Sequence, residues 1–193
     1  MEAVKNGWDR SIDHDDIRVK LISAFDQLTH DEKRKDKDRT KRKLCYIVIA
    51  LIQLGSGCRV SEAIQAFEYF LEHDKKECKV KIAKSEKVHK DGNMIAKPRY
   101  RLVQNIDSVN YRPLSRCLQT TFEGIEYPRQ AMDNYLNREF QCNTHSLRYS
   151  RINYLLYKKK REPTLVAKHV GHVNTNMLTR YTQTIESDKL FED

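Results

Sequence analysis

The sequence contains no apolar run long enough to span a membrane, and its N-terminus lacks the apolar stretch of a secretory signal peptide. Its five cysteines are an odd number without a Cys-x-x-Cys pair, and no histidine lies at zinc-finger spacing from them. Neither a disulfide framework nor a zinc site is therefore predicted. Internal repeats are also lacking, as is an acidic cluster of the kind that holds two metal ions. The cysteines are expected to be small core or boundary residues.

Positive charge predominates in this chain. Its 193 residues, enough for one domain with a substantial core, include 36 lysines and arginines against 27 acidic residues, which gives a formal net charge of +9. Such an excess favours a polyanionic partner, in particular a nucleic acid. Residues 31–43 are almost wholly charged and are interpreted as a solvated loop followed by the start of a helix. Some of these lysines can still touch backbone phosphate, in contacts that salt would weaken.

Helical periodicity marks the first part of the chain. Residues 13–28 place apolar side chains on one stripe behind an acidic first turn, which is typical of an amphipathic helix. Residues 44–54 are apolar on nearly all sides and predict a central buried helix. Gly55 and Gly57 are expected to end this helix, and Ser61 is expected to cap the next one.

From residue 78 onward, apolar residues recur at every second position, which is typical of a β-strand. Residues 78–82 alternate between apolar side chains and lysines, and residues 99–103 can return as a partner strand after a turn near residues 91–93. Lys84 continues the parity of the apolar positions, so it is expected to point inward at the end of the strand. Residues 128–140 again have a helical pattern. The sequence thus predicts a mainly helical fold with a small antiparallel β-sheet, of the α+β class.

The C-terminal third contains an arginine in a position that predicts burial. If residues 147–158 form a helix, Arg148 shares one face with three apolar residues. A guanidinium group keeps its proton in such a place and needs an anionic partner. His145 precedes Arg148 by three residues and points to nearly the same spot. The two side chains can therefore converge on a phosphate.

A second group of polar residues follows. Pro163 is typical of a first helical position and Gly171 of a helix stop, so a helix is predicted between them. His172 comes directly after the stop, and Tyr181 lies at helical spacing from two apolar residues on a short further helix. Taken singly, this histidine is consistent with charge compensation at a helix end, and this tyrosine with a half-buried core residue.

A further arginine lies between two predicted buried helices. Arg59 occupies the short turn after Gly57, where a charged side chain again needs an anionic partner. Glu62, in the first turn of the next helix, can orient Arg59, or it can simply favour the helix N-terminus by its charge.

These residues lie in three segments that resemble the motifs of the tyrosine recombinases, also called the phage integrase family. The segments are G-S-G-C-R-V-S-E-A at residues 55–63, T-H-S-L-R-Y-S at residues 144–150 and V-G-H-V-N-T-N-M-L-T-R-Y-T at residues 170–182. The resemblance covers roughly residues 44–184. It implies a tyrosine-recombinase-like catalytic domain that cleaves and rejoins double-stranded DNA.

Four residues would then stabilise the phosphodiester under attack. Arg59 and Arg148 would hold its non-bridging oxygens in bidentate geometry. His145 and His172 would donate further hydrogen bonds, and one of them would help to deprotonate the nucleophile. Because the arginines supply the positive charge, neither a metal ion nor another cofactor is expected.

The resemblance also implies the nucleophile and the general acid. Tyr181 would attack phosphorus and form a 3′-phosphotyrosyl intermediate, and a lysine of the hairpin would protonate the departing 5′ hydroxyl. Lys84 is the expected lysine. The Gly-Lys-Gly turn common in relatives is missing here, which leaves Lys87 and Lys97 as alternatives.

The sequence is compatible with several biological functions of this family. We expect a site-specific recombinase or integrase of the kind that viruses and plasmids encode, with viral genome integration as one use. The alternatives are a chromosome-dimer or telomere resolvase with the same chemistry, and a catalytically inactive DNA-binding module of the same fold. The intact set of cationic residues argues against an inactive DNA-binding module, because a site that has lost catalysis has no physical reason to keep buried cations.

Residues 1–193 are expected to form a single catalytic domain. Within it, residues 1–43 contribute an N-terminal helix and a charged segment, and residues 182–193 a short acidic tail. The separate N-terminal core-binding domain of full-length relatives is expected to be absent. Relatives act as homotetramers on paired DNA sites, whereas an isolated catalytic domain can be monomeric. The expected location is the host cytoplasm or nucleoid, without membrane contact.

Overall fold

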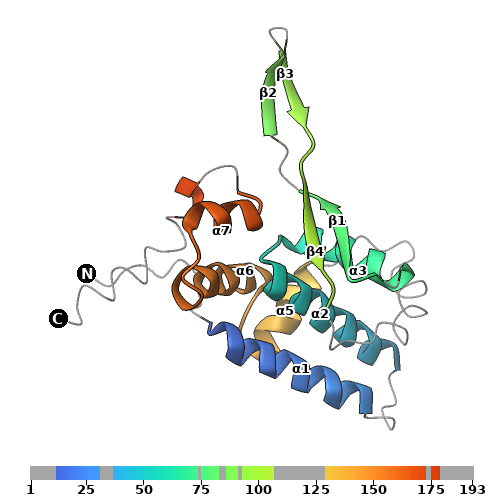
Figure 1. Cartoon of the computed structure of the whole chain (residues 1–193). Coiled ribbons are helices and arrows are strands. Elements are labelled where there is room, and N and C mark those ends of the chain that lie inside the picture. The colour runs from blue at the N-terminus through green and yellow to red at the C-terminus, as the bar shows by residue number, and fades with distance from the viewer. Residues whose placement is uncertain are drawn as a thin grey trace, which may run out of the picture.

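A body of helices carries a long β-hairpin that projects away from it (Figure 1). The computed structural model describes residues 12–30, 37–73, 75–82, 86–90, 93–106, 129–172 and 175–178. The helices are α1 (His14–His30), α2 (Lys37–Ser56), α3 (Val60–Glu72), α5 (Arg129–Phe140), α6 (Thr144–Asn153) and α7 (Pro163–His169). A π-helical segment (Tyr154–Lys158) extends α6, and a 3-10 turn (Thr175–Met177) follows α7. The strands are β1 (Glu77–Lys81), β2 (Glu86–Lys90), β3 (Asn93–Lys97) and β4 (Tyr100–Gln104).

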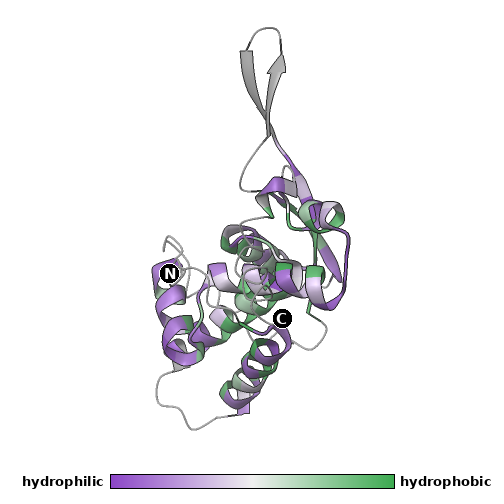
Figure 2. Ribbon diagram, turned by 90° about the vertical axis from the view of Figure 1, so that its left-hand side faces the viewer, coloured by the Kyte–Doolittle hydropathy of each residue, from purple (hydrophilic) through white to green (hydrophobic). Residues whose placement is uncertain are grey.

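Helix α2 forms the centre of the helical body. All of its residues 44–54 are buried, as their apolar sequence predicts. Helices α1, α3, α5 and α6 pack around it, and in Figure 2 the helices show both hydrophilic and hydrophobic stretches, the pattern of helices buried on one side. Each fully buried leucine or isoleucine of this core contributes about 1.5–3 kcal/mol to folding. The predicted central helix is confirmed.

Helix α1 covers one side of α2, and its predicted apolar stripe is buried there. Ile17, Leu21, Phe25 and Leu28 are all buried in the core. The helix begins behind Asp13, whose carboxylate accepts hydrogen bonds from two backbone N–H groups of the first turn, both at 2.9 Å. Because the acidic side chain satisfies these donors, the helix begins at residue 14.

The start of α3 differs from the expectation. Ser61 does not cap this helix, because α3 begins at Val60 and Arg59 is its N-cap residue. The carboxylate of Glu62 accepts a hydrogen bond from the backbone N–H of Arg59 at 3.1 Å. The Glu62 side chain thus reaches back to the N-cap residue Arg59, as in a capping box. Sequence rules that look first for serine or threonine at the cap position miss this arrangement.

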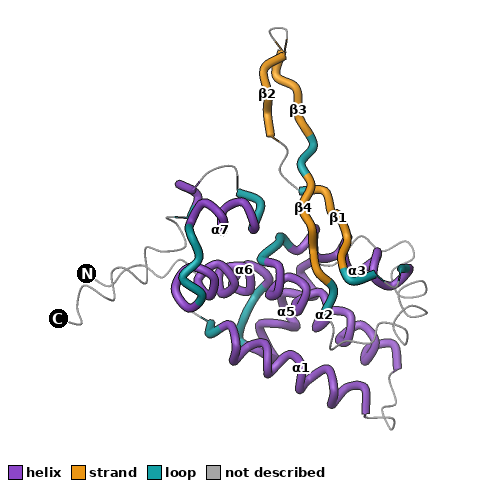
Figure 3. The backbone as a smooth tube through the Cα atoms, viewed as in Figure 1, coloured by secondary structure: helices purple, strands orange, loops and turns teal. Residues whose placement is uncertain are grey.

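The four strands form one hairpin in two parts. Strands β1 and β4 pair in antiparallel register, with Cys78 opposite Val103, and β2 pairs with β3 further out. A backbone hydrogen bond from Ile82 to Arg99, at 2.8 Å, extends the inner pair. The inner strands match the predicted ones to within a residue, whereas the outer pair was not predicted. Figure 3 shows that only the inner pair lies beside the helices, near α2 and α3.

The C-terminal elements return to the central helix. The predicted helix over residues 147–158 is present, but it begins at Thr144 and its last turn is π-helical. Helix α7 has Pro163 in its first turn, and it ends before Gly171, whose φ is +75°. No single described helix is long and apolar enough to cross a membrane, and α2 and α3 pass that test only as a pair bent by 113°.

Candidate active site

The turn between α2 and α3 is held by three buried side chains. The carbonyl groups of residues 56–58 each accept one side-chain hydrogen bond. Arg101 of β4 donates to the first at 2.5 Å, and Arg148 of α6 donates to the second at 2.5 Å. Gln53 of α2 donates to the third at 3.1 Å. Since each buried carbonyl is paired, the turn has one well-defined conformation.

Glycine at position 57 is required for two reasons. Its φ is +65°, a conformation that residues with a Cβ atom rarely adopt. A Cβ atom built on Gly57 would also lie 2.9 Å from Cγ1 of Val170 and 3.2 Å from Cγ of Arg151. The absence of a side chain therefore lets α6 and the end of α7 approach this turn closely.

Arg59 follows the turn and pairs with Glu62. The two side chains approach to 3.2 Å, between Nη1 of Arg59 and Oε1 of Glu62. The carboxylate is completely buried, whereas the Arg59 side chain is 23% exposed. Its guanidinium group therefore reaches the surface while one side is fixed to a buried anion. This contact places Glu62 where it can orient Arg59.

Helix α6 supplies Arg148 and His145. Its first turn is fixed by Asn143, which accepts a hydrogen bond from the backbone N–H of Ser146 at 2.8 Å. Arg148 is only 2% exposed, as the sequence predicts. Its Nη1 holds the turn at residue 57, and its buried Nη2 has no hydrogen-bond partner among the described residues. One donor of this guanidinium group thus remains available to a ligand.

His172 lies directly after the end of α7 and is 3% exposed. Its backbone N–H donates to the carbonyl of Ala167 at 2.8 Å, and its own carbonyl accepts from Arg99 at 3.2 Å. These contacts fix the backbone on both sides of the imidazole. Burial, together with the positive charges of Arg148, Arg59 and Arg101, lowers the pKa of His172 to about 3.

His145 experiences the same electrostatic environment. Its pKa is also lowered, first by burial and then by the charges of Arg148, Arg129 and Arg59. The arginines at positions 59 and 148 thus act on both histidines, so the four side chains form one electrostatic unit. Both imidazoles are neutral at pH 7, and each offers one donor and one acceptor.

Several predicted site residues lie outside the described part of the chain. These are Tyr181 and Lys84. The alternative lysines, Lys87 and Lys97, lie on β2 and β3, but their side chains are not described. Among the described residues, Arg59 and Arg148 lie close enough to His145 and His172 for their charges to lower both pKa values, and Glu62 pairs with Arg59.

The sequence analysis missed Arg101. This side chain comes from β4, where Arg101 and Val103 share the buried face of the strand. Its Nη1 lies 3.7 Å from Oε2 of Glu62. Strand parity places an arginine on the core face here, which is the signal that would have found it. Among the described residues, no three histidine, cysteine or acidic side chains are grouped to hold a metal ion.

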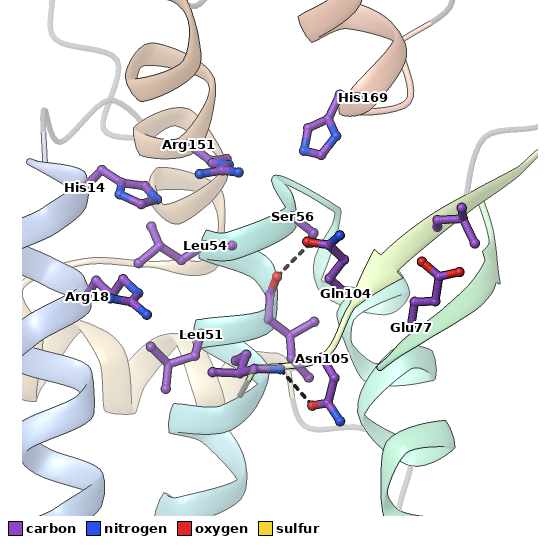
Figure 4. A pocket seen from close by; sticks show the side chains of 14 residues that line it. His14, Arg18, Leu51, Leu54, Ser56, Glu77, Gln104, Asn105, Arg151 and His169 are labelled. Atoms are coloured by element: carbon purple, nitrogen blue, oxygen red, sulfur yellow. Dashed lines mark hydrogen bonds between the residues drawn. The ribbon is translucent and has the colours of Figure 1, made fainter. Parts of the chain in front are cut away.

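A separate hollow of about 490 Å³ lies between α1, the end of α2 and β4. Its lining includes His14, Arg18, Arg151 and His169 together with apolar residues of α2. Figure 4 shows His14, Arg18 and Arg151 beside Leu51 and Leu54, with His169 above the end of α2. None of the predicted site residues lines it. The hollow is therefore distinct from the arginine and histidine cluster.

Comparisons with known proteins find two viral relatives of this chain. No family model matches the sequence. The chain is 38% identical to "Putative integrase V10" of Sputnik virophage, over 98% of this chain and 91% of that protein. It is 31% identical to "Putative integrase ORF241" of Acidianus two-tailed virus, over 94% of this chain and 66% of that protein.

A solved structure shares the fold. The XerH site-specific recombinase, solved bound to a palindromic difH substrate in a post-cleavage complex, matches 98% of this chain with a TM-score of 0.50 and 16% identity. This chain spans 57% of that recombinase chain. The viral relatives, together with the shared fold, show that the chain belongs to the integrase family of tyrosine recombinases.

Proposed function

We propose that this chain is a site-specific DNA recombinase of integrase type, which cleaves and rejoins DNA strands through a 3′-phosphotyrosyl intermediate. The observation that carries the proposal is the turn at which Arg59 and Arg148 meet, with His145 and His172 near enough for both arginine charges to act on them. The integrase names of the viral relatives support it. Double-stranded DNA is the proposed partner, in line with the net charge of +9.

The two arginines stabilise the phosphate under attack. Arg148 is held rigidly by its bond to the turn and keeps Nη2 for a non-bridging oxygen. Arg59 is partly exposed and fixed on one side by Glu62, and its guanidinium group is proposed to hold another phosphate oxygen. Because both groups are preorganised, little reorganisation is needed when negative charge develops on the phosphate oxygens.

The neutral histidines supply hydrogen bonds and a proton acceptor. Because their pKa values are lowered, both imidazoles are neutral at pH 7, and the unprotonated ring nitrogen of one of them is the proposed acceptor of the phenolic proton. The other imidazole donates its N–H to a phosphate oxygen. A bound phosphate raises the pKa of both groups, because its negative charge offsets the arginines.

Tyr181 is the proposed nucleophile and Lys84 the proposed general acid. A bond forms between the tyrosine oxygen and phosphorus, and the bond from phosphorus to the 5′ oxygen breaks. The phenolic proton goes to a histidine, and the lysine gives its proton to the leaving oxygen. Because the phosphotyrosyl bond conserves the energy of the broken phosphodiester bond, a second 5′ hydroxyl reverses the reaction without ATP. A homotetramer on two paired DNA sites is the proposed assembly.

Covalent trapping tests this function. Nicked duplexes with randomised sequence around the nick lose a short fragment on cleavage, so the protein–DNA adduct accumulates and survives denaturing electrophoresis. We expect an adduct from the wild type that Tyr181→Phe abolishes. The matched control Tyr69→Phe changes a tyrosine of α3, outside the cluster, and should leave the adduct intact.

Two other outcomes would contradict the proposal. An adduct that persists in Tyr181→Phe would assign the nucleophile to another residue. Salt-sensitive DNA binding without any adduct across the library would instead support a DNA-binding module that has the fold without its chemistry.

A further inference from the structure

Arg101 lies beneath the proposed site rather than in it. Its side chain is 5% exposed, whereas that of Arg59 is 23% exposed. Nη2 of Arg101 donates to the carbonyl of Ser56 at 2.5 Å, and Nη1 lies 3.7 Å from Oε2 of Glu62. A buried guanidinium group in this position cannot reach DNA, so any effect on the reaction acts through its neighbours.

Glu62 is shared between two arginines. One carboxylate oxygen lies 3.2 Å from Arg59 and the other 3.7 Å from Arg101. With a single arginine the buried pair would be neutral and would attract a phosphate weakly. With the second arginine the group of three carries one net positive charge, which is poorly screened because the carboxylate is fully buried.

The same side chain joins the hairpin to the turn. Arg101 stands opposite Val80 in the inner strand pair, which leads outward to β2 and β3. Its hydrogen bond to Ser56 fixes the end of α2 immediately before the turn that carries Arg59. The base of the hairpin and the position of Arg59 are therefore coupled through one buried group.

We propose that Arg101 is a positioning residue of this site, which offsets the charge of Glu62 and fixes the Ser56–Arg59 turn so that Arg59 presents a net positive charge to the DNA phosphate. This inference rests on the proposed recombinase function. It predicts that the requirement for Arg101 depends on the charge at position 62, which a purely structural role in packing does not predict.

The test uses Arg101→Met, Arg101→Lys, Glu62→Gln and the double variant Arg101→Met/Glu62→Gln. Single-turnover cleavage is measured at saturating nicked DNA, with DNA affinity measured separately. We expect Arg101→Met to slow cleavage about tenfold or more, with a smaller change in affinity, and Arg101→Lys to remain closer to the wild type. The double variant should recover part of the rate, because removing the carboxylate charge restores the charge of Arg59.

Arg138→Met is the matched control, because it removes an arginine side chain that is 59% exposed on α5. It should leave the rate unchanged. A double variant that is as slow as Arg101→Met, or slower, would overturn the proposal. A wild-type cleavage rate in Arg101→Met would also overturn it, as would equal cleavage rates in Arg101→Met and Arg101→Lys. If Arg101→Met does not fold, recovery of folding and cleavage in the double variant supports the same charge balance.

A second readout separates this inference from the proposed function. Binding of inorganic phosphate, followed by the NMR signal of the His172 ring, requires no chemistry. Arg101→Met should weaken this binding severalfold, and Glu62→Gln in the same chain should restore it. Absence of a covalent adduct with the wild type would refute the recombinase proposal alone, whereas unchanged phosphate binding in Arg101→Met would refute the role of Arg101.

Discussion

The pKa of His172 gives the sharpest quantitative test of the site. Burial and three arginine charges lower it to about 3 in the folded chain, whereas an unfolded histidine titrates near 6.5. The unfolded chain therefore binds the proton more tightly. Stability from the neutral imidazole is fully present above about pH 6.5 and is lost as the pH falls towards 3.

The magnitude follows from the two pKa values. Between pH 7 and pH 5 the unfolded state takes up most of a proton at this position and the folded state almost none. The free energy of unfolding should therefore fall by about 2 kcal/mol through His172 alone. This figure hardly changes if the folded pKa is one unit higher, because pH 5 still lies above it. The lowered pKa of His145 adds a loss of the same sign.

Urea unfolding of the wild type and of His172→Gln at both pH values measures this contribution. The glutamine variant does not titrate here, so its loss of stability between pH 7 and pH 5 should be about 2 kcal/mol smaller than that of the wild type. Val170→Ala is the control, since it perturbs a buried neighbour without a titrating group. An NMR titration that gives His172 a pKa of 6 or above would refute the reasoning.

Three further predictions concern the turn and the core. Gly57→Ala should destabilise the chain by at least about 1–2 kcal/mol from the positive φ alone. The new Cβ atom would lie 2.9 Å from Val170, and this contact should also slow DNA cleavage. A variant as stable and active as the wild type would contradict this prediction. Phe67→Ala removes a fully buried ring and should cost about 3–5 kcal/mol in urea unfolding. In thiol labelling followed by mass spectrometry, four buried cysteines should react only after unfolding; these are Cys45, Cys58, Cys78 and Cys142.

Local sequence patterns were sufficient for part of the fold. The central helix over residues 44–54 is apolar on nearly all sides, a pattern that predicts burial. The burial of Arg148 followed from its helix face, and the end of α7 from Gly171. Each of these predictions depends on residues within two turns of one another, where spacing alone fixes the geometry.

Contacts between segments that are distant in the sequence account for the features that sequence patterns did not predict. Arg59 is an N-cap residue because Glu62 reaches back to it, and this carboxylate is buried partly because Arg101 of β4 lies beside it. The π-helical turn after α6 packs Tyr154 against His14 of α1, with ring centroids 4.0 Å apart. The contact between Tyr154 and His14 leaves no periodic signal in the sequence, and for Arg101 strand parity predicts the buried face but not the partner. Residues that act through tertiary partners therefore escape an analysis of motifs.

The neutral histidines make sense in terms of the total charge of the site. Its three arginines, Arg59, Arg101 and Arg148, and the carboxylate of Glu62 leave two positive charges. A phosphodiester brings one negative charge and gathers a second as the nucleophile adds. The site is thus matched to the transition state rather than to the bound substrate, which is the condition for accelerating the chemical step. Two imidazolium ions in the resting site would add two positive charges before the second negative charge develops, so the lowered pKa values of His145 and His172 fit the proposed chemistry.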